Sequence, residues 1–254
     1  MAKATLKSRA DMDVMRESSR IVADVLKLMK GLIKPGVTTL ELDRFAEDYI
    51  RSQGGVPAFK GYGFEEDNLF PASICASVDD QVVHGIPAKR VLRDGEIISI
   101  DVGVQKHGFF GDGAWTFAVG SISPEKQRLM DVTEQSLYKG IQQACAGNFL
   151  HDISAAVQGH VENAGFSVVR ELVGHGIGRS LHEEPAVPNF GKAGSGLRLK
   201  AGLTIAIEPM VNFGTYHVVV EPDGWTVRTK DGNPSAHFEH TVAITENGPE
   251  ILTV

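Results

Sequence analysis

The 254-residue sequence contains little cysteine and no long apolar run. Its two cysteines, Cys75 and Cys145, provide neither a disulfide framework nor a Cys-x-x-Cys zinc site, which is typical of a protein in a reducing compartment. No apolar run approaches the roughly 20 residues of a membrane span, and the first ten residues lack the apolar core of a secretory signal. We therefore expect a cytoplasmic protein with no membrane contact.

An excess of positive charge is also missing. Asp and Glu outnumber Lys and Arg by 32 to 25, so the net charge is −7, and this argues against sequence-specific binding of nucleic acid. The apolar content of 42% and the charged content of 22% are those of a globular protein. The composition therefore favours an enzyme or a binding protein.

The order of predicted elements is two helices followed by strands, and this order occurs twice. Apolar periodicity and capping residues predict helices over about 11–34, 39–53, 124–146 and 151–164. Alternating or continuous apolar runs predict strands over about 73–83, 96–105, 114–119, 166–173, 203–212, 216–221 and 237–244. The Gly-rich stretch 108–113 predicts a turn, so the strand 114–119 is expected to begin after it.

The two halves, about 11–121 and 122–254, share local signatures. Leu92-Arg-Asp-Gly95 precedes Asp101 at the same spacing at which Leu199-Lys-Ala-Gly202 precedes Glu208. Each match alone is weak, because turn glycines recur by chance. Together they predict a duplicated α+β unit that brings Asp101 and Glu208 to one cavity near a pseudo-two-fold axis. Since no linker separates the halves, we expect residues 1–254 to form a single domain.

Four acidic residues occur where an ionised side chain is costly. Asp101, Glu208 and Glu239 each border a run rich in Ile, Val and Ala, and Asp112 lies in a Gly-punctuated segment. A lone buried carboxylate is unfavourable, and neighbouring carboxylates about 4 Å apart repel by roughly 4 kcal/mol at an effective dielectric constant near 20. A single strand-end acid is usually a cap or an ion pair. If these four converge with His175, divalent cations are the simplest compensation.

The ligand types indicate the kind of metal. Carboxylates and an imidazole suit Mn, Fe, Co or Zn, whereas a structural zinc site would normally contain thiolates. Five side chains are more than one open catalytic ion requires, and two ions that share carboxylates would use them all. Such a pair lowers the pKa of water from about 15.7 toward 7 and so provides hydroxide at neutral pH.

Six short runs surround these residues. They are Ile100-Asp101-Val102-Gly103, Gly111-Asp112, Gly174-His175-Gly176-Ile177-Gly178, His182-Glu183-Glu184-Pro185, Ile207-Glu208-Pro209-Met210 and Phe238-Glu239-His240-Thr241. The runs, and ligand spacings of 11, 63, 33 and 31 residues, resemble those of type I methionine aminopeptidases over nearly the whole chain. The resemblance implies the pita-bread fold, an internally duplicated α+β fold, in a short form without a Cys-rich N-terminal extension.

The resemblance also implies a division of roles among the ligands. Asp101 would chelate one ion, Asp112 and Glu239 would bridge both, and His175 and Glu208 would complete the other. Glu208 would in addition accept the proton of the attacking water.

Two further histidines match the family's catalytic histidines. His182 would donate a hydrogen bond to the scissile carbonyl oxygen as negative charge develops there. His84 would contact the backbone of the scissile bond and help to transfer protons. Taken alone, His84 could equally be a turn residue. We treated His237 as a surface or packing residue.

The methionine pocket implied by the resemblance has apolar and aromatic walls, which suit a flexible thioether. Its candidate residues are Phe59, Tyr62, Phe70, Cys75, Leu181 and Trp225. Two departures concern its shape. About five more residues, including Glu65-Glu66-Asp67, lie between Tyr62 and Phe70 than in the best-known bacterial members, and Leu181 stands where an aromatic residue is familiar.

The implied activity is metal-dependent removal of the N-terminal Met from nascent proteins and peptides whose second residue is small. The alternatives are a proline-specific aminopeptidase of the same fold, which generally carries a large additional domain, and a non-catalytic pita-bread binding module. We expect a monomer. The early basic residues Lys7, Arg9, Arg16 and Arg20 are in the simpler interpretation a solvated helix face, and in the alternative a contact with the ribosome.

Overall fold

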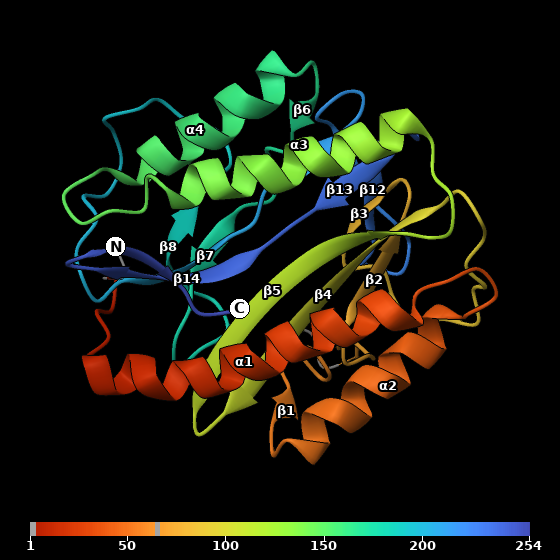
Figure 1. Cartoon of the computed structure of the whole chain (residues 1–254), viewed down its shortest axis with the longest axis horizontal. Helices are drawn as coiled ribbons and strands as arrows, with labels where there is room; N and C mark the ends of the chain where they lie inside the picture. Colours follow the sequence, from red (N-terminus) through yellow and green to blue (C-terminus); the bar gives the residue numbers. More distant parts are fainter. Residues whose placement is uncertain (1–3, 64–66) are drawn as a thin grey trace.

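The computed structural model describes residues 4–63 and 67–254. Glu65 and Glu66 of the acidic insertion lie outside the described residues. Figure 1 shows two pairs of helices on opposite outer sides of the molecule, with the strands between them. The two main apolar cores lie between each helix pair and the sheet that it covers.

The first half begins with two helices whose ends follow from local sequence. Helix α1 spans Arg9–Leu32 and α2 spans Thr39–Ser52. Ser8 and Thr38 close capping boxes with Asp11 and Glu41, which satisfies backbone N–H groups at both helix starts. Both predicted helices are confirmed. They cover one antiparallel sheet made of β1 (Val56–Pro57), β2 (Cys75–Val78), β4 (Ile97–Lys106) and β5 (Phe109–Ala118).

Strand β5 starts five residues earlier than we predicted. The turn lies at His107-Gly108, and Gly111 and Gly113 belong to the strand. These glycines allow α1 to pack directly on the sheet, because a Cβ at Gly111 would lie 2.7 Å from the backbone nitrogen of Ser19. The glycines therefore do not form the turn that their pattern predicted; they lie in the strand and allow the close approach of the helix.

The second half repeats the order of helices and antiparallel strands. Helices α3 (Pro124–Ile141) and α4 (Leu150–Asn163) pack against a five-stranded sheet in the order β15-β14-β9-β7-β8. Its strands are β7 (Gly174–Gly176), β8 (Glu183–Val187), β9 (Thr204–Ile207), β14 (His240–Thr245) and β15 (Gly248–Ile251). The division of the chain into equivalent halves remains a prediction.

Two small sheets complete the fold, and they interrupt strands that we predicted as continuous. One sheet contains β6 (Ser167–Val168), β10 (Met210–Asn212) and β13 (Ser235–His237). The other contains β3 (Gln81–Val83), β11 (Val218–Val220) and β12 (Val227–Thr229). The predicted strand 203–212 divides at Glu208-Pro209, where proline cannot donate to a ladder. The predicted strand 237–244 divides at Glu239. Both acids thus lie at breaks between sheets.

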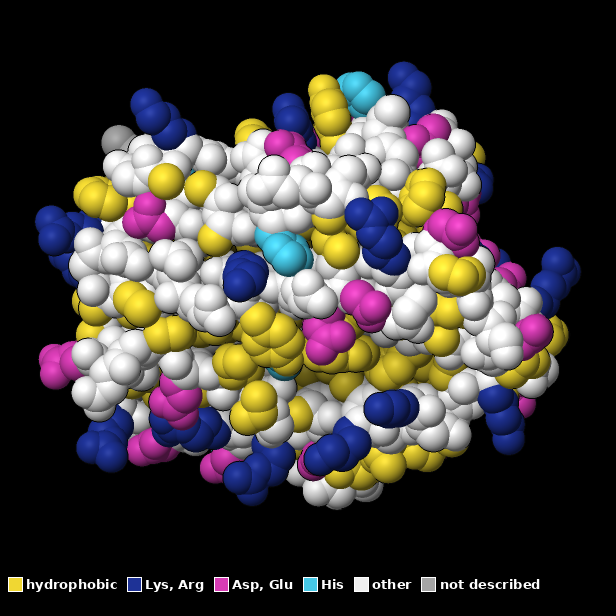
Figure 2. Space-filling model, turned by 45° about the horizontal axis from the view of Figure 1, so that its top comes forward, with side chains coloured by type: hydrophobic (Ala, Val, Ile, Leu, Met, Phe, Trp, Pro, Cys, Tyr) yellow, Lys and Arg dark blue, Asp and Glu magenta, His cyan; other side chains and the backbone are white. Residues whose placement is uncertain are grey.

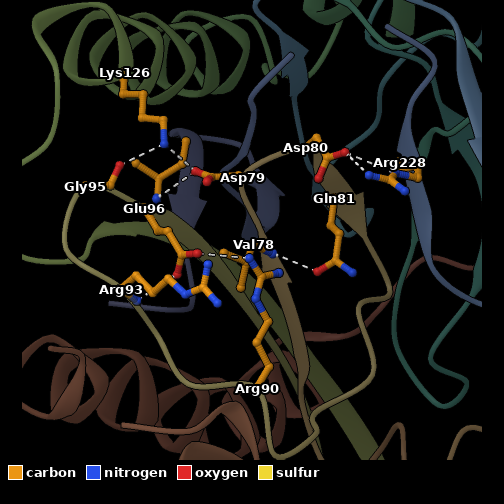
Figure 3. A network of polar contacts seen from close by, with 11 residues as sticks. Val78, Asp79, Asp80, Gln81, Arg90, Arg93, Gly95, Glu96, Lys126 and Arg228 are labelled. Carbon is orange, nitrogen blue, oxygen red and sulfur yellow. Dashed lines mark hydrogen bonds and ion pairs between the residues drawn. The ribbon is translucent and has the colours of Figure 1, made fainter. Parts of the chain in front are cut away.

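A polar turn between β2 and β3 connects the two halves (Figure 3). Asp79 accepts hydrogen bonds from Lys126 of α3 (2.6 Å) and from the backbone nitrogen of Ile97 (3.1 Å). Asp80 pairs with Arg228 of β12, with 3.0 Å between Nε and Oδ2. The turn leads directly into β3, which ends at the residue before His84.

The surface carries charges of both signs. On the face drawn in Figure 2, Lys and Arg side chains are interspersed with Asp and Glu side chains. Within residues 4–63 and 67–254, no helix has both the length and the apolar character needed to cross a membrane.

Candidate metal centre

Asp101 and Asp112 come from neighbouring strands of the first sheet. In the register of β4 and β5, Asp101 faces Ala114 and Gly103 faces Asp112. Directly paired residues share a face, as do residues two apart, so both carboxylates project from the same face as a diagonal pair. Cys75 pairs with Asp101 in β2 and lies on this face as well.

His175, Glu208 and Glu239 come from the second half. His175 lies in β7 and pairs with Ala206 of β9, two residues before Glu208. Glu239 precedes β14, and its backbone nitrogen donates to the carbonyl of Ala114 in β5 (2.9 Å). This hydrogen bond joins the sheets of the two halves at the point where their acids meet.

The five predicted ligands line one cavity. The Nε2 atom of His175 lies 3.6 Å from Oε1 of Glu208 and 3.9 Å from Oδ2 of Asp112. Asp112, His175 and Glu239 each offer a ligand atom within 4.8 Å of the others. These three residues form a candidate metal site, and Asp101 and Glu208 lie at the same end of the cavity.

The electrostatics of the cluster follow from burial. Burial, opposed by a hydrogen bond with Asp112, raises the pKa of Asp101 to about 7. Burial, and then the charges of the neighbouring acids, raise the pKa values of Asp112, Glu208 and Glu239 well above their usual range. The acids therefore ionise together only if positive charge is placed among them.

The donor set fits divalent cations. Within the described part of the chain, Oδ1 of Asp101 and Oε1 of Glu239 are buried and have no hydrogen-bond partner. Burial lowers the pKa of His175 to about 3, so its imidazole is neutral at neutral pH, as a metal ligand must be. The Nδ1 atom of His175 lies 2.9 Å from the carbonyl of Gly176, which leaves Nε2 for a metal.

The cavity has a volume of about 650 Å³ and an apolar side. This volume lies within the range typical of small-ligand sites. The six residues predicted for the methionine pocket all border it: Phe59, Tyr62, Phe70, Cys75, Leu181 and Trp225. Phe59 and Phe70 pack edge to face, as do Phe70 and Trp225. That these walls bind a methionine side chain remains a prediction.

His84 and His182 also border the cavity. His84 has a left-handed backbone (φ +58°), a strained conformation for a histidine. Burial and the nearby His182 lower the pKa of His84 to about 4. His182 is exposed and lines the cavity, so its ring lies at the cavity mouth. Its centroid is 4.3 Å from that of His175, and partial desolvation lowers its pKa.

Glu183, the residue after His182, binds the N-terminal segment through Lys7. Lys7 is 7% exposed, and its Nζ lies 2.5 Å from Oε2 of Glu183. The other oxygen of Glu183 accepts from the backbone nitrogens of Arg179 and Ser180. Our interpretation of Lys7 as part of a solvated face is therefore wrong, because the ion pair buries it.

Sequence reasoning missed a buried histidine at the site. His237 is 1% exposed, and its Nε2 lies 3.7 Å from Oε2 of Glu208. Neither ring nitrogen has a hydrogen-bond partner among the described residues. A signal was present, since His237 is two residues before Glu239 and alternate residues of a strand share a face.

Comparisons with known proteins agree with this geometry. Residues 13–246 match the model of metallopeptidase family M24. The chain is 54% identical over 250 residues to a methionine aminopeptidase of Clostridium perfringens, with 98% of each chain covered. It is 53% identical over 247 residues to methionine aminopeptidase 1 of Bacillus subtilis, covering 97% of this chain and 98% of the relative.

The chain belongs to the methionine aminopeptidases of family M24. The crystal structure of methionine aminopeptidase from Rickettsia prowazekii matches 99% of this chain and 100% of its own, with a TM-score of 0.96 and 38% identity. The enzyme from Thermotoga maritima matches with the same TM-score and 42% identity, covering 99% of both chains. The expected α+β pita-bread fold of this methionine aminopeptidase is thereby confirmed.

A more distant likeness concerns the fold alone. A prolidase from Pyrococcus furiosus has a TM-score of 0.79 and 19% identity, and the match covers 98% of this chain but 65% of the prolidase. The proline-specific alternative therefore shares the architecture with this methionine aminopeptidase and is separated from it by sequence.

Proposed function

We propose that this methionine aminopeptidase removes the N-terminal Met from nascent proteins and peptides with a small second residue, by means of two divalent ions. The observation that carries the proposal is the convergence of four buried carboxylates and a neutral imidazole at one end of an apolar cavity. A cationic pair neutralises the cluster, and the adjoining apolar walls supply a place for a thioether side chain.

The metals would be held by residues of both halves. Asp101 would bind one ion, His175 and Glu208 the other, and Asp112 and Glu239 would be shared. When bound, Mn, Fe, Co or Zn ions would supply a Lewis acid and would lower the pKa of water toward neutrality.

The remaining steps belong to the side chains. Glu208 would accept the proton released by the attacking water; its carboxylate lies 3.6 Å from Nε2 of His175 and 3.7 Å from Nε2 of His237, which supports this role. His182, at the cavity mouth, would donate to the scissile carbonyl oxygen, and His84 would contact the adjacent backbone. The free amine of the substrate would meet the carboxylate end of the cavity, which would restrict cleavage to the first residue.

The supporting experiment compares peptides. Protein loaded with Mn, Fe, Co or Zn is given Met-Ala-Ser, Met-Leu-Ser and Ala-Pro-containing peptides at neutral pH. We expect release of Met from Met-Ala-Ser and much slower release from Met-Leu-Ser. Cleavage of the Ala-Pro bond without Met release would favour a proline-specific peptidase, and no turnover with any metal would favour a binding module.

Nascent chains are the natural substrates under this proposal, and we expect a monomer to act on them. A ribosome contact would involve the exposed basic residues of α1. Lys7 is not available for it because Glu183 binds it, and Arg16 is engaged by Glu250 (2.8 Å). Arg9 and Arg20 remain as candidates.

A further inference from the structure

A short hydrogen bond connects the pocket wall with the histidine at the cavity mouth. The hydroxyl oxygen of Tyr62 lies 2.6 Å from Nδ1 of His182, and the ring centroids are 5.2 Å apart. In the predicted methionine pocket, Tyr62 would serve as an apolar wall. The hydrogen bond shows that the hydroxyl group of Tyr62 makes a second contact, with His182.

The backbone holds Tyr62 in place for this contact. Its nitrogen donates to the carbonyl of Phe59 (2.9 Å), and its carbonyl accepts from the nitrogen of Phe70 (2.8 Å). Phe59 in turn packs tightly over β4, where a Cβ at Gly103 would lie 2.6 Å from the Phe59 ring. The tyrosine is thus anchored to the same sheet that carries Asp101.

The chemistry of the two rings sets the direction of the hydrogen bond. Burial and the negative charge of Asp112 raise the pKa of Tyr62, so its hydroxyl keeps its proton. A neutral imidazole has one donor and one acceptor nitrogen. A neutral imidazole nitrogen is a better acceptor than a phenol oxygen, so Tyr62 donates to Nδ1.

We propose that Tyr62 is a positioning residue that fixes His182 as the tautomer with its proton on Nε2 and holds the ring at the cavity mouth. Nδ1 is occupied by Tyr62, so Nε2 is the edge left to meet a substrate. This inference rests on the proposed function, in which His182 donates to a carbonyl oxygen. The opposite tautomer would present a lone pair to that oxygen and would repel its developing charge.

The first test is the tautomer itself. In protein loaded with diamagnetic Zn²⁺ and labelled with ¹⁵N-histidine, the ring nitrogens of His182 are assigned by their loss in His182→Asn. We expect a protonated Nε2 and a bare Nδ1 in the wild-type protein. In Tyr62→Phe, which keeps the aromatic ring and removes the hydroxyl, we expect the two ¹⁵N shifts to move toward each other as tautomers mix. Tyr49→Phe is the matched control, because its hydroxyl donates to Asp24 (3.2 Å) away from the cavity.

The second test separates positioning from pocket formation. Tyr62→Phe should lower kcat for Met-Ala-Ser by about 3- to 10-fold, the range expected for one lost neutral hydrogen bond, with KM little changed because the apolar wall remains. A rise in KM alone, or unchanged kcat together with unchanged ¹⁵N shifts, would overturn the proposal.

The two tests also separate this proposal from the proposed function. A wild-type His182 with its proton on Nδ1 would overturn the inference even if Tyr62→Phe failed to fold. If the loaded wild-type protein released no Met, the proposed function would fail, whereas the spectra would still confirm or contradict the effect of Tyr62 on the ring.

Discussion

Asp112 lies among the other residues of the cluster, and its carboxylate interacts electrostatically with those of Asp101 and Glu239. Its Oδ2 faces His175, and its backbone nitrogen donates a hydrogen bond to the hydroxyl oxygen of Thr241 (3.0 Å). Asp112→Asn keeps the shape and removes the charge, so we expect turnover of Met-Ala-Ser to fall to background. The metal-free variant should be more stable than the metal-free wild type, because one of the repelling acids is gone. Near-normal turnover, measured beside thermal unfolding in EDTA, would refute the shared-ligand role.

His237 is a second residue whose environment makes a prediction. Among the described residues its ring nitrogens have no hydrogen-bond partner, and Nε2 lies 3.7 Å from Oε2 of Glu208. Residues that support a metal ligand typically contribute about 10–100-fold to metal affinity. We expect His237→Phe to weaken Mn²⁺ binding by about tenfold in calorimetric titration.

The control for His237 is His160→Phe. His160 lies in α4 and also has a buried Nε2 with no hydrogen-bond partner in the described part of the chain, but it is not among the residues that line the cavity. Equal Mn²⁺ affinities in wild type and His237→Phe, or equal losses in both variants, would contradict a role for His237 at the site.

The meeting of the five candidate ligands at one cavity could be predicted from sequence, because each is an acid or a histidine in a segment that otherwise favours burial. The contact of Tyr62 with His182 could not be predicted, and the spacing of His237 from Glu239 indicates a shared strand face but not the burial of His237 against Glu208. Both depend on side-chain directions and on a loop conformation, and the spacing of residues does not encode these. Lys7 shows the reverse error, since a charged residue near a helix start is usually solvated and here is buried by Glu183.

Among the elements, the contact of α1 with β5 depends on glycine. A Cβ at Gly111 would meet the backbone of Ser19 at 2.7–2.8 Å, whereas a Cβ at Gly31, inside α1, meets nothing within 4 Å. We expect Gly111→Ala to lower the free energy of unfolding by about 1–3 kcal/mol through overpacking. Gly31→Ala should leave it equal or raise it by roughly 0.5–1 kcal/mol. Urea unfolding measures both, and a neutral Gly111→Ala would contradict the direct contact.

The helices were more predictable than the strands. Ser8 and Thr38 indicate helix starts because each forms a capping box, which involves only residues close together in sequence. Strand limits depend on partners that are distant in sequence. Gly111 therefore suggested a turn, and Pro209 was included in a strand that it ends. The breaks at Glu208 and Glu239 have a consequence for the site, because they release these acids from regular pairing.

For the molecule as a whole, the cluster predicts how stability depends on pH. Without metal, the folded protein retains protons on Asp112, Glu208 and Glu239 that the unfolded chain loses near pH 4. The buried histidines oppose this effect only below pH 6.5, where unfolded imidazoles take up protons. Above pH 6.5 the folded state therefore binds more protons, and its stability falls as pH rises.

Calorimetry can check this prediction. In EDTA, the Tm should fall between pH 6.5 and about 8.5, at roughly 1.4 kcal/mol of stability per pH unit for each carboxyl that remains protonated. Added Mn²⁺ should raise the Tm and weaken or reverse the dependence, because the metal binds the ionised form. A Tm that is flat or rises with pH in EDTA would show that the buried acids do not destabilise the metal-free protein.

The order of two helices followed by strands, which occurs twice along the chain, was predictable from sequence, whereas the equivalence of the two halves stays a prediction. The Leu-x-x-Gly spacing to Asp101 and Glu208 indicated two similar units with one acid each. How the units dock was not predictable, since it rests on a few pairings such as Thr241 with Asp112 and Glu239 with Ala114. Those pairings create the cavity that neither half contains alone.

The central claim is that a metal pair held by both halves cleaves Met from a peptide. The most direct measurement follows Met release from Met-Ala-Ser while Mn²⁺ is titrated into chelator-treated protein at neutral pH. The account predicts no release before metal is added, and then a rise in rate as the metal binds. An undiminished rate in the presence of excess chelator, with no metal retained by the protein, would contradict it.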